Sequence, residues 1–95
     1  MEDIFCEAIK TQKRVKMEYN GTERVIEPHT FGYDGGVAKV RASQARGYSK
    51  SGNYDLKVFI IAKMSGIKLL DETFNVNSDY RAGSDMGIPK IVCQI

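Results

Sequence analysis

The chain contains no tryptophan, only two prolines and two cysteines, and a single histidine. Cys6 and Cys93 lie at opposite ends without a CxxC pair, so neither a thiol redox motif nor a zinc cluster can be assembled. Both are therefore predicted to be buried free thiols. No apolar run approaches the roughly 20 residues of a membrane span, and the acidic start Met1-Glu2-Asp3 is unlike a signal peptide. These absences predict a cytoplasmic protein without a membrane partner, a metal or a cofactor.

A catalytic set is also missing. His29 has no serine or cysteine beside it at a recognised spacing, and a nucleophile needs a base within hydrogen-bond reach, so a fold-supporting histidine is predicted. The glycines at 32, 35 and 36 lack the Lys-Ser/Thr end of a phosphate loop and open a strand. We therefore expect no enzyme. The 95 residues, 42% of them hydrophobic, predict one domain over residues 1–95.

The first third of the chain changes from helical to strand periodicity. Apolar residues recur at helical spacing between residues 4 and 9, which predicts a short amphipathic helix. From Arg14 to Tyr19 the period is two, with Val15 and Met17 on the same side as Tyr19. Asn20-Gly21 then predicts a type I′ hairpin turn. A second strand is expected from Glu23 to about Phe31.

Turn signals divide the middle of the chain. Asp34-Gly35-Gly36 precedes a third strand predicted from Val37 to about Ala45. Arg46 to Asn53 is expected to be an exposed loop. The run from Val58 to Ala62 is apolar on both faces, which predicts a central strand covered twice. Ser65-Gly66 is then expected to turn the chain into the next strand.

The C-terminal part supplies the last predicted strand. Residues 75–87 are polar, and apolar character returns at Ile88, Ile91 and Val92, with Pro89 suited to a sheet edge. Short strands at close spacing with one N-terminal helix predict a mainly β fold of at least five strands. We expect a strongly bent antiparallel sheet or an SH3/Sm-like barrel.

Charge is concentrated in the middle third. Residues 37–68 contain seven basic residues against Asp55 alone, a balance of +6. Lys39 and Arg41 share a strand face by spacing, and Lys57 and Lys63, which are six residues apart, share one face if their strand is regular. These faces either bind phosphates or simply solvate an exposed surface.

Two tyrosines accompany these cations. Tyr48 and Tyr54 lie in the predicted loop, and aromatic rings near cations hold single strands by stacking and charge. Arg24 is either half of a ligand clamp with Glu27 or structural, and the i, i+3 spacing, which places them on opposite faces of a strand, favours the structural role. The candidate ligand-binding residues are Lys39, Arg41, Tyr48, Lys57, Lys63 and Arg24.

Three spaced segments, at residues 8–19, 23–29 and 55–74, together resemble a WYL domain. That family has a helix leading into a strand that ends in tyrosine, an arginine before a Glu-Pro step, and a phenylalanine strand followed by Leu-Leu-Asp-Glu-x-Phe. The matching residues are Ile9, Arg14, Val15, Tyr19, Arg24, Glu27, Pro28, Phe59, Leu69, Leu70, Asp71, Glu72 and Phe74. The namesake Trp-Tyr-Leu run is replaced by Val37, Ala38 and Lys39. In the family, the phenylalanine strand continues as Arg-x-Asp-Arg-Ile. Residues 60–64 take this place here, and Lys63 is the one basic residue among them.

The resemblance implies an SH3-like or Sm-like barrel that senses a nucleotide or single-stranded nucleic acid in transcription regulation. WYL-like domains usually follow a helix-turn-helix domain, which this chain lacks. We therefore expect a standalone sensor, or a subunit that gives ligand sensitivity to a separate regulator protein. The alternative is a protein-interaction or homo-oligomerisation module that has lost its ligand, because small barrels have exposed edges.

Overall fold

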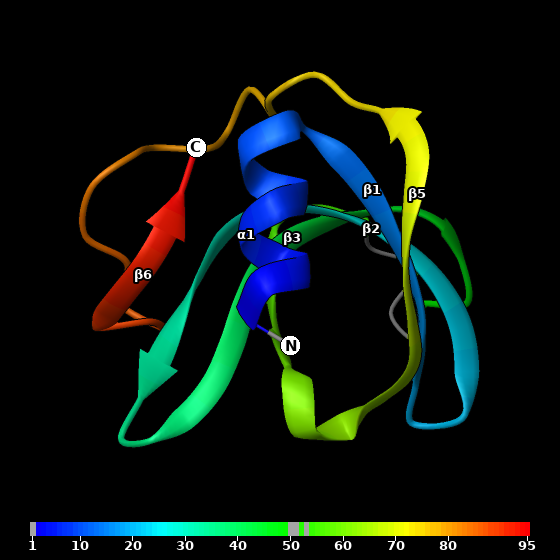
Figure 1. Cartoon of the computed structure of the whole chain (residues 1–95), viewed down its shortest axis with the longest axis horizontal. Coiled ribbons are helices and arrows are strands. Elements are labelled where there is room, and N and C mark those ends of the chain that lie inside the picture. Colours follow the sequence, from blue (N-terminus) through cyan, green and yellow to red (C-terminus); the bar gives the residue numbers. More distant parts are fainter. Residues whose placement is uncertain (1, 50–51, 53) are drawn as a thin grey trace.

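One helix packs against a six-stranded antiparallel sheet in the computed structural model, which describes residues 2–49, 52 and 54–95 (Figure 1). The elements are α1 (Glu2–Thr11), β1 (Lys13–Tyr19), β2 (Thr22–Asp34), β3 (Val37–Gly47), β4 (Lys57–Ile60), the 3-10 helix η1 (Ile61–Lys63), β5 (Met64–Thr73) and β6 (Lys90–Gln94). The predicted mainly β class with one N-terminal helix is confirmed. No helix in the described ranges is long and apolar enough to cross a membrane.

The first hairpin forms as its sequence predicts. Val15 and Met17 are buried on the inner face of β1, and Asn20 and Gly21 both have positive φ, at 51° and 83°. The turn pairs Tyr19 with Thr22 and sets the register of β1 against β2. Local alternation and turn chemistry therefore decide this part of the fold.

Strand β2 pairs with three other strands, β1, β3 and β6, and is longer than predicted. It extends three residues past Phe31, and β3 extends two past Ala45, because the two strands continue to pair as far as Asp34–Val37 and Arg24–Gly47. Its other side pairs first with β1 and then with β6. The hydrogen-bonded path is β4-β3-β2-β1-β5.

The link between β4 and β5 bends this path back on itself. The two strands lie at opposite ends of the path, yet only the three residues of η1 separate them (Figure 1). The prediction of a central strand over Val58–Ala62 is wrong, since β4 ends at Ile60 and, among the described strands, pairs only with β3. The predicted turn at Ser65-Gly66 is also wrong, because both residues lie inside β5 and η1 makes the bend.

Helix α1 covers the open side of the bent sheet (Figure 1). Its residues Phe5, Ala8 and Ile9 are buried, and the Phe5 ring stacks on Phe31 of β2 with the centroids 6.0 Å apart. The helix contributes these three side chains to a core shared with Val15, Met17, Ile26, Val40, Ala42, Phe59, Ile61 and Met64. The amphipathic helix predicted from the apolar spacing is therefore confirmed.

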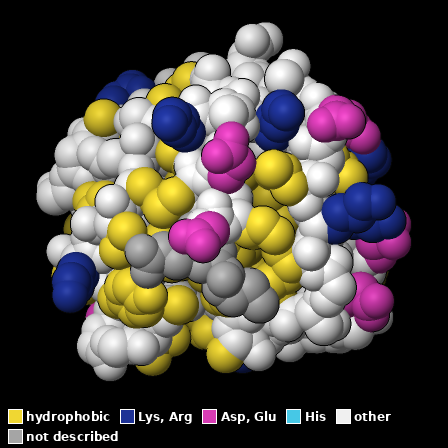
Figure 2. Space-filling model, in the orientation of Figure 1, with side chains coloured by type: hydrophobic (Ala, Val, Ile, Leu, Met, Phe, Trp, Pro, Cys, Tyr) yellow, Lys and Arg dark blue, Asp and Glu magenta, His cyan; other side chains and the backbone are white. Residues whose placement is uncertain are grey.

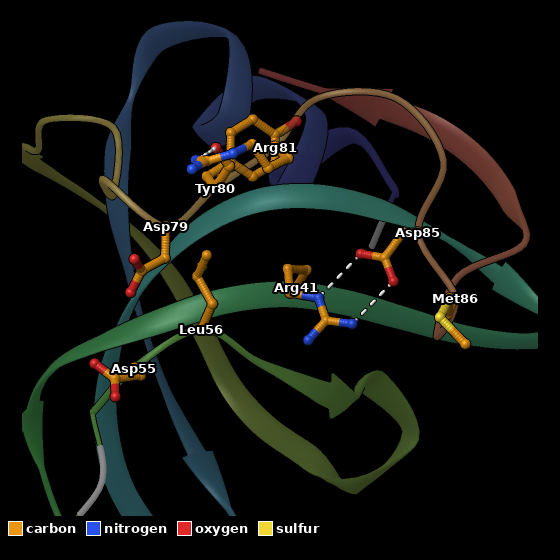
Figure 3. Close-up of a pocket in the computed structure, with 8 residues that line it drawn as sticks. All are labelled: Arg41, Asp55, Leu56, Asp79, Tyr80, Arg81, Asp85 and Met86. Carbon is orange, nitrogen blue, oxygen red and sulfur yellow. Dashed lines mark hydrogen bonds and ion pairs between the residues drawn. The ribbon is translucent and has the colours of Figure 1, made fainter.

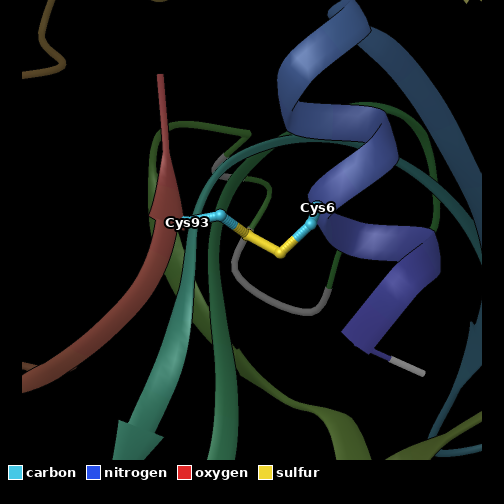
Figure 4. Close-up of a disulfide and its surroundings, with 2 residues drawn as sticks. All are labelled: Cys6 and Cys93. Atoms are coloured by element: carbon cyan, nitrogen blue, oxygen red, sulfur yellow. A yellow bond between two sulfur atoms is a disulfide. The ribbon is translucent and has the colours of Figure 1, made fainter.

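The prediction of two free thiols is wrong. Cys6 of α1 and Cys93 of β6 form a disulfide, with their Cα atoms 5.7 Å apart (Figure 4). The cysteines are 87 residues apart in sequence and become neighbours because β6 pairs with β2 beside the helix (Figure 4). No spacing rule for short cysteine motifs detects a pair of this kind.

The predicted C-terminal strand is confirmed at a sheet edge. β6 begins directly after Pro89 and pairs with residues 30–33 of β2. The irregular segment before it is held by side chains: Tyr80 Oη donates to the Ile95 carbonyl at 2.9 Å, and Gln94 bonds both backbone groups of Gly83. The polar segment 75–87 is thereby fixed against the sheet.

Candidate functional site

Arg24 is a buried arginine in the sheet. Only 8% of the residue is exposed, and its guanidinium carbon lies 5.1 Å from the ring centroid of Tyr19 and 5.7 Å from that of Tyr48. Nε donates to Thr22 Oγ1 at 3.2 Å. An arginine near the start of β2 therefore lies close to two aromatic rings, a geometry that favours a cation through the ring quadrupole.

Strand register places these groups together. Arg24 pairs with Met17 of β1, so it faces the same way as the buried side of that strand. On its other side it pairs with Gly47, where an added Cβ would meet the Glu23 carbonyl oxygen at 2.5 Å and Arg24 Cα at 2.8 Å. Gly47 also has a φ of 104°, so glycine lets β3 end against Arg24 and deliver Tyr48 onto it.

Lys57 approaches the same place from β4. Its Nζ lies 5.6 Å from the Phe59 ring centroid and donates to Ser49 Oγ at 3.4 Å. The Phe59 ring in turn packs edge-on against Tyr19 with the centroids 5.1 Å apart. Burial lowers the pKa of Lys57, and the positive charge of Arg24 lowers it further. We call Tyr19, Arg24, Tyr48, Lys57 and Phe59 the Arg24 cluster.

The Arg24 cluster contains two cations and no acid. Among the described residues, Arg24 has no carboxylate within ion-pairing distance. Beside it, a hollow of about 130 Å³ is lined by Glu23, Arg24, Val25, Arg46 and Gly47, which include one acid, Glu23, and none of the other four residues of the Arg24 cluster. Burying a charge without a counter-charge is unfavourable, so this guanidinium suits an anion that enters from solvent.

Gln44 lies under the loop that carries Tyr48. Its Nε2 donates to the carbonyls of Tyr48 at 2.8 Å and Arg46 at 3.3 Å, while its buried Oε1 accepts no hydrogen bond from the described residues. Sequence reasoning missed this residue, because only the fold places it beneath the loop. An unpaired buried acceptor is uncommon, and here it accompanies the uncompensated cation of Arg24.

Arg41, a predicted ligand residue, is neutralised within the chain. Its Nε and one terminal nitrogen donate to the two Asp85 carboxylate oxygens, each at 2.9 Å (Figure 3). The hydrogen bonds raise the pKa of Arg41 and lower that of Asp85.

The adjoining pocket of about 390 Å³ is lined by Arg41, Asp55, Leu56, Asp79, Tyr80, Arg81, Asp85 and Met86. Its three carboxylates outnumber its two guanidinium groups, so this pocket does not suit an anion.

The other two predicted lysines lie away from the Arg24 cluster. Lys39 donates to Asp34 at 2.8 Å across the β2–β3 turn. Lys63 lies in η1 with an exposed side chain, so the regular strand expected to align it with Lys57 does not form. Of the six predicted residues, the structure brings together Arg24, Tyr48 and Lys57. Lys50, Ser51 and Asn53 of the predicted loop lie outside the described residues.

A network of ion pairs crosses the outer face of the sheet. Arg14 donates to Glu27 at 2.9 Å and to Glu72 at 3.1 Å, and Arg46 binds both Glu72 oxygens at 2.7 Å. These hydrogen bonds, first from Arg46 and then from Arg14, lower the pKa of Glu72 to about 2. Glu27 thus faces away from Arg24, as the i, i+3 spacing predicts.

His29 is fully buried and supports the fold. Its Nδ1 donates to the Glu27 carbonyl at 2.7 Å, and Nε2 accepts the Asn77 N–H at 3.0 Å, so the ring is neutral. Burial lowers the pKa of His29 from 6.5, against weaker opposing effects of the Glu27 carbonyl and carboxylate. The imidazole therefore attaches the 75–87 segment to β2.

The buried histidine predicts a pH dependence of stability. Because its pKa is depressed in the folded state, only the unfolded chain gains a proton as the pH falls below 6.5, and the free energy of unfolding should decrease. Urea unfolding at intervals between pH 7.5 and 5 measures this slope. The variant His29→Gln should show a shallower slope. Equal slopes for both proteins in this range would contradict the assignment.

Comparison of the chain with protein-family models, with curated proteins and with solved structures finds no match. Within the described residues, no group of three histidine, cysteine, aspartate or glutamate side chains is placed to hold a metal ion. The Arg24 cluster is the part of the described chain whose chemistry points to a ligand.

Proposed function

We propose that the protein is a non-enzymatic sensing module that binds an anionic ligand at the Arg24 cluster. The observation that carries this proposal is the guanidinium of Arg24, which is more than nine-tenths buried without a carboxylate partner among the described residues. The anion would supply the missing counter-charge, and charge-assisted hydrogen bonds to a guanidinium are strong and directional.

The aromatic groups suit a ligand that also carries a planar ring. Tyr48 remains 53% exposed although Arg24 covers its ring, so part of its surface is available for stacking. A phosphate together with a base is the chemistry of nucleotides and single-stranded nucleic acids, the ligands implied by the resemblance to WYL domains. Ligand occupancy would then be passed to a separate transcription regulator.

The test is titration of ¹⁵N-labelled protein with inorganic phosphate, 5′-nucleotides and a single-stranded oligonucleotide, followed by NMR. Ligand-dependent shifts should centre on Arg24, Tyr48 and Lys57. Arg24→Gln should weaken binding at least tenfold, because a hydrogen bond to a charged group is worth about 1.5–3 kcal/mol. Lys68→Gln removes one exposed charge from the same basic segment and should leave affinity nearly unchanged.

Two outcomes would reject this proposal: no shift in the Arg24 cluster with any of these anions, or equal affinity for Arg24→Gln and the unmodified protein.

The second candidate function is a homo-oligomerisation or protein-interaction module. It is favoured by β6, which pairs only with β2 in the described chain and has Val92 40% exposed. A discrete oligomer in light scattering, without any ligand binding, would support that alternative.

A further inference from the structure

The solvent side of α1 carries three exposed charged residues, Asp3, Glu7 and Lys10. They recur at i, i+4 and i+7, so they form one stripe along the helix, opposite its buried side. Asp3 and Glu7 occupy the N-terminal part of this stripe, and Lys10 lies in the last turn. Among the described residues, none of the three side chains forms an ion pair or a hydrogen bond. The stripe therefore presents charges of both signs to solvent.

Hydrophobic side chains lie on both sides of this stripe (Figure 2). Helix α1 lies between β5 and β6 and contacts both strands (Figure 1). Ile67 and Leu69 of β5 pack against the core while remaining partly exposed. The same holds for Ile95, directly after β6, and for Ile4 of α1. We call the stripe together with these four residues the α1 face.

The charges of the α1 face restrict the kind of partner that it fits. Two acids against one base repel a polyanion such as a nucleic acid, and they also oppose an anionic membrane surface. A protein surface that presents acid and base in the reverse order complements both signs at once. The hydrophobic side chains beside the stripe add apolar contact area to such a protein interface.

A second copy of this chain presents that reverse order when its α1 approaches antiparallel. Glu7 and Lys10 lie about 4.5 Å apart along the helix axis, at about 1.5 Å per residue. A two-fold axis that crosses α1 at right angles between them places Glu7 of each copy opposite Lys10 of the other. The two helix dipoles are then antiparallel, which is favourable. The same axis places each hydrophobic side of the α1 face against the same side of the second copy.

We infer that the protein forms a symmetric homodimer through the α1 face, in which Glu7 and Lys10 of the two copies form two ion pairs across the two-fold axis. The face comprises one side of a ten-residue helix and a few half-buried side chains, so a weak and reversible dimer is expected. This inference goes beyond the proposed function and does not depend on it, because no residue of the Arg24 cluster belongs to the α1 face. It also differs from association through the β6 edge, since Val92 lies outside this face.

Sedimentation equilibrium of the unmodified protein at increasing concentration tests this inference. The average mass should rise from 10.6 kDa toward twice that value. Glu7→Lys and Lys10→Glu should each weaken dimerisation by about tenfold or more, because either change opposes like charges at both symmetry-related contacts. A 1:1 mixture of the two variants should dimerise again, because each contact of the mixed dimer joins a lysine to a glutamate.

Charge reversals outside the α1 face provide matched controls. Glu18→Lys in β1 and Lys63→Glu in η1 make the same changes at exposed positions, and neither should change the dimerisation constant. Far-UV circular dichroism of Glu7→Lys and Lys10→Glu checks that both variants keep the fold.

Three results would overturn this inference. A monomer at every concentration up to about 1 mM would exclude the dimer. A dimer that Glu7→Lys leaves intact while Val92→Lys weakens it would place the interface on the β6 edge. Two weakened variants whose mixture stays monomeric would show that Glu7 and Lys10 do not meet across the interface. Anion binding at Arg24 is measured separately by NMR, so none of these results decides the proposed function.

Discussion

Removal of the Cys6–Cys93 disulfide is expected to lower the free energy of unfolding by about 2–5 kcal/mol. The bond closes a loop over a sequence separation of 87 residues, nearly the whole chain. In the chain-entropy description, a cross-link over such a loop restricts the unfolded ensemble strongly, so its loss favours unfolding. The bond also attaches α1, which supplies Phe5 to the core, to the edge strand β6.

Urea unfolding of the protein with and without dithiothreitol measures this effect. The double variant Cys6→Ser/Cys93→Ser should reproduce the reduced protein, and dithiothreitol should not shift its midpoint further. A larger m-value is expected for both forms, because the unfolded chain without the cross-link exposes more surface. Identical midpoints for the oxidised and reduced protein would show that the bond contributes nothing to stability.

Replacement of Phe59 with alanine is expected to cost about 3–5 kcal/mol. The side chain is only 2% exposed and packs edge-on against Tyr19, so its removal leaves a cavity lined by core residues. For a domain of this size, that loss is a large share of the total stability. The same substitution also removes the ring beneath Lys57, so the Arg24 cluster should loosen with the core.

Val37→Ala provides the control for this prediction, since Val37 is 42% exposed at the start of β3 and its truncation should change stability by less than about 0.5 kcal/mol. Chemical unfolding of both variants at one pH and temperature gives the comparison. A Phe59→Ala protein as stable as the control would show that the ring is not part of the core.

Local sequence patterns predict the parts of this fold that local interactions decide. The period of two over Arg14–Tyr19 and the Asn20-Gly21 turn determine the first hairpin, and the helical spacing at its N-terminus determines α1. The prediction of a central strand over Val58–Ala62 is wrong because it assumes that two apolar faces need cover on both sides, from the rest of a barrel and from the N-terminal helix. In the structure, irregular backbone covers part of one of these faces: a Cβ on Gly87 would lie 3.0 Å from Val58.

Ion pairs between residues far apart in the sequence could not be predicted from local patterns. The ion pair of Arg41 with Asp85 joins residues 44 apart, and that of Arg46 with Glu72 joins residues 26 apart. The first pair compensates Arg41, a predicted ligand-binding residue, and the second compensates Arg46 of the basic middle third; no spacing rule anticipates either pair. Arg24, for which the sequence favours a structural role, is a buried cation that the fold leaves without an acid among the described residues.

The disulfide also determines how the molecule responds to tension. Force applied to the chain outside Cys6 and Cys93 passes from α1 to β6 through the sulfur–sulfur bond, so the hydrogen-bonded strands between them carry none of it. About 300 Å of contour length at full extension is thereby withheld from stretching. While the bond is intact, the sheet and the Arg24 cluster within it are mechanically isolated from anything that pulls on the ends of this chain.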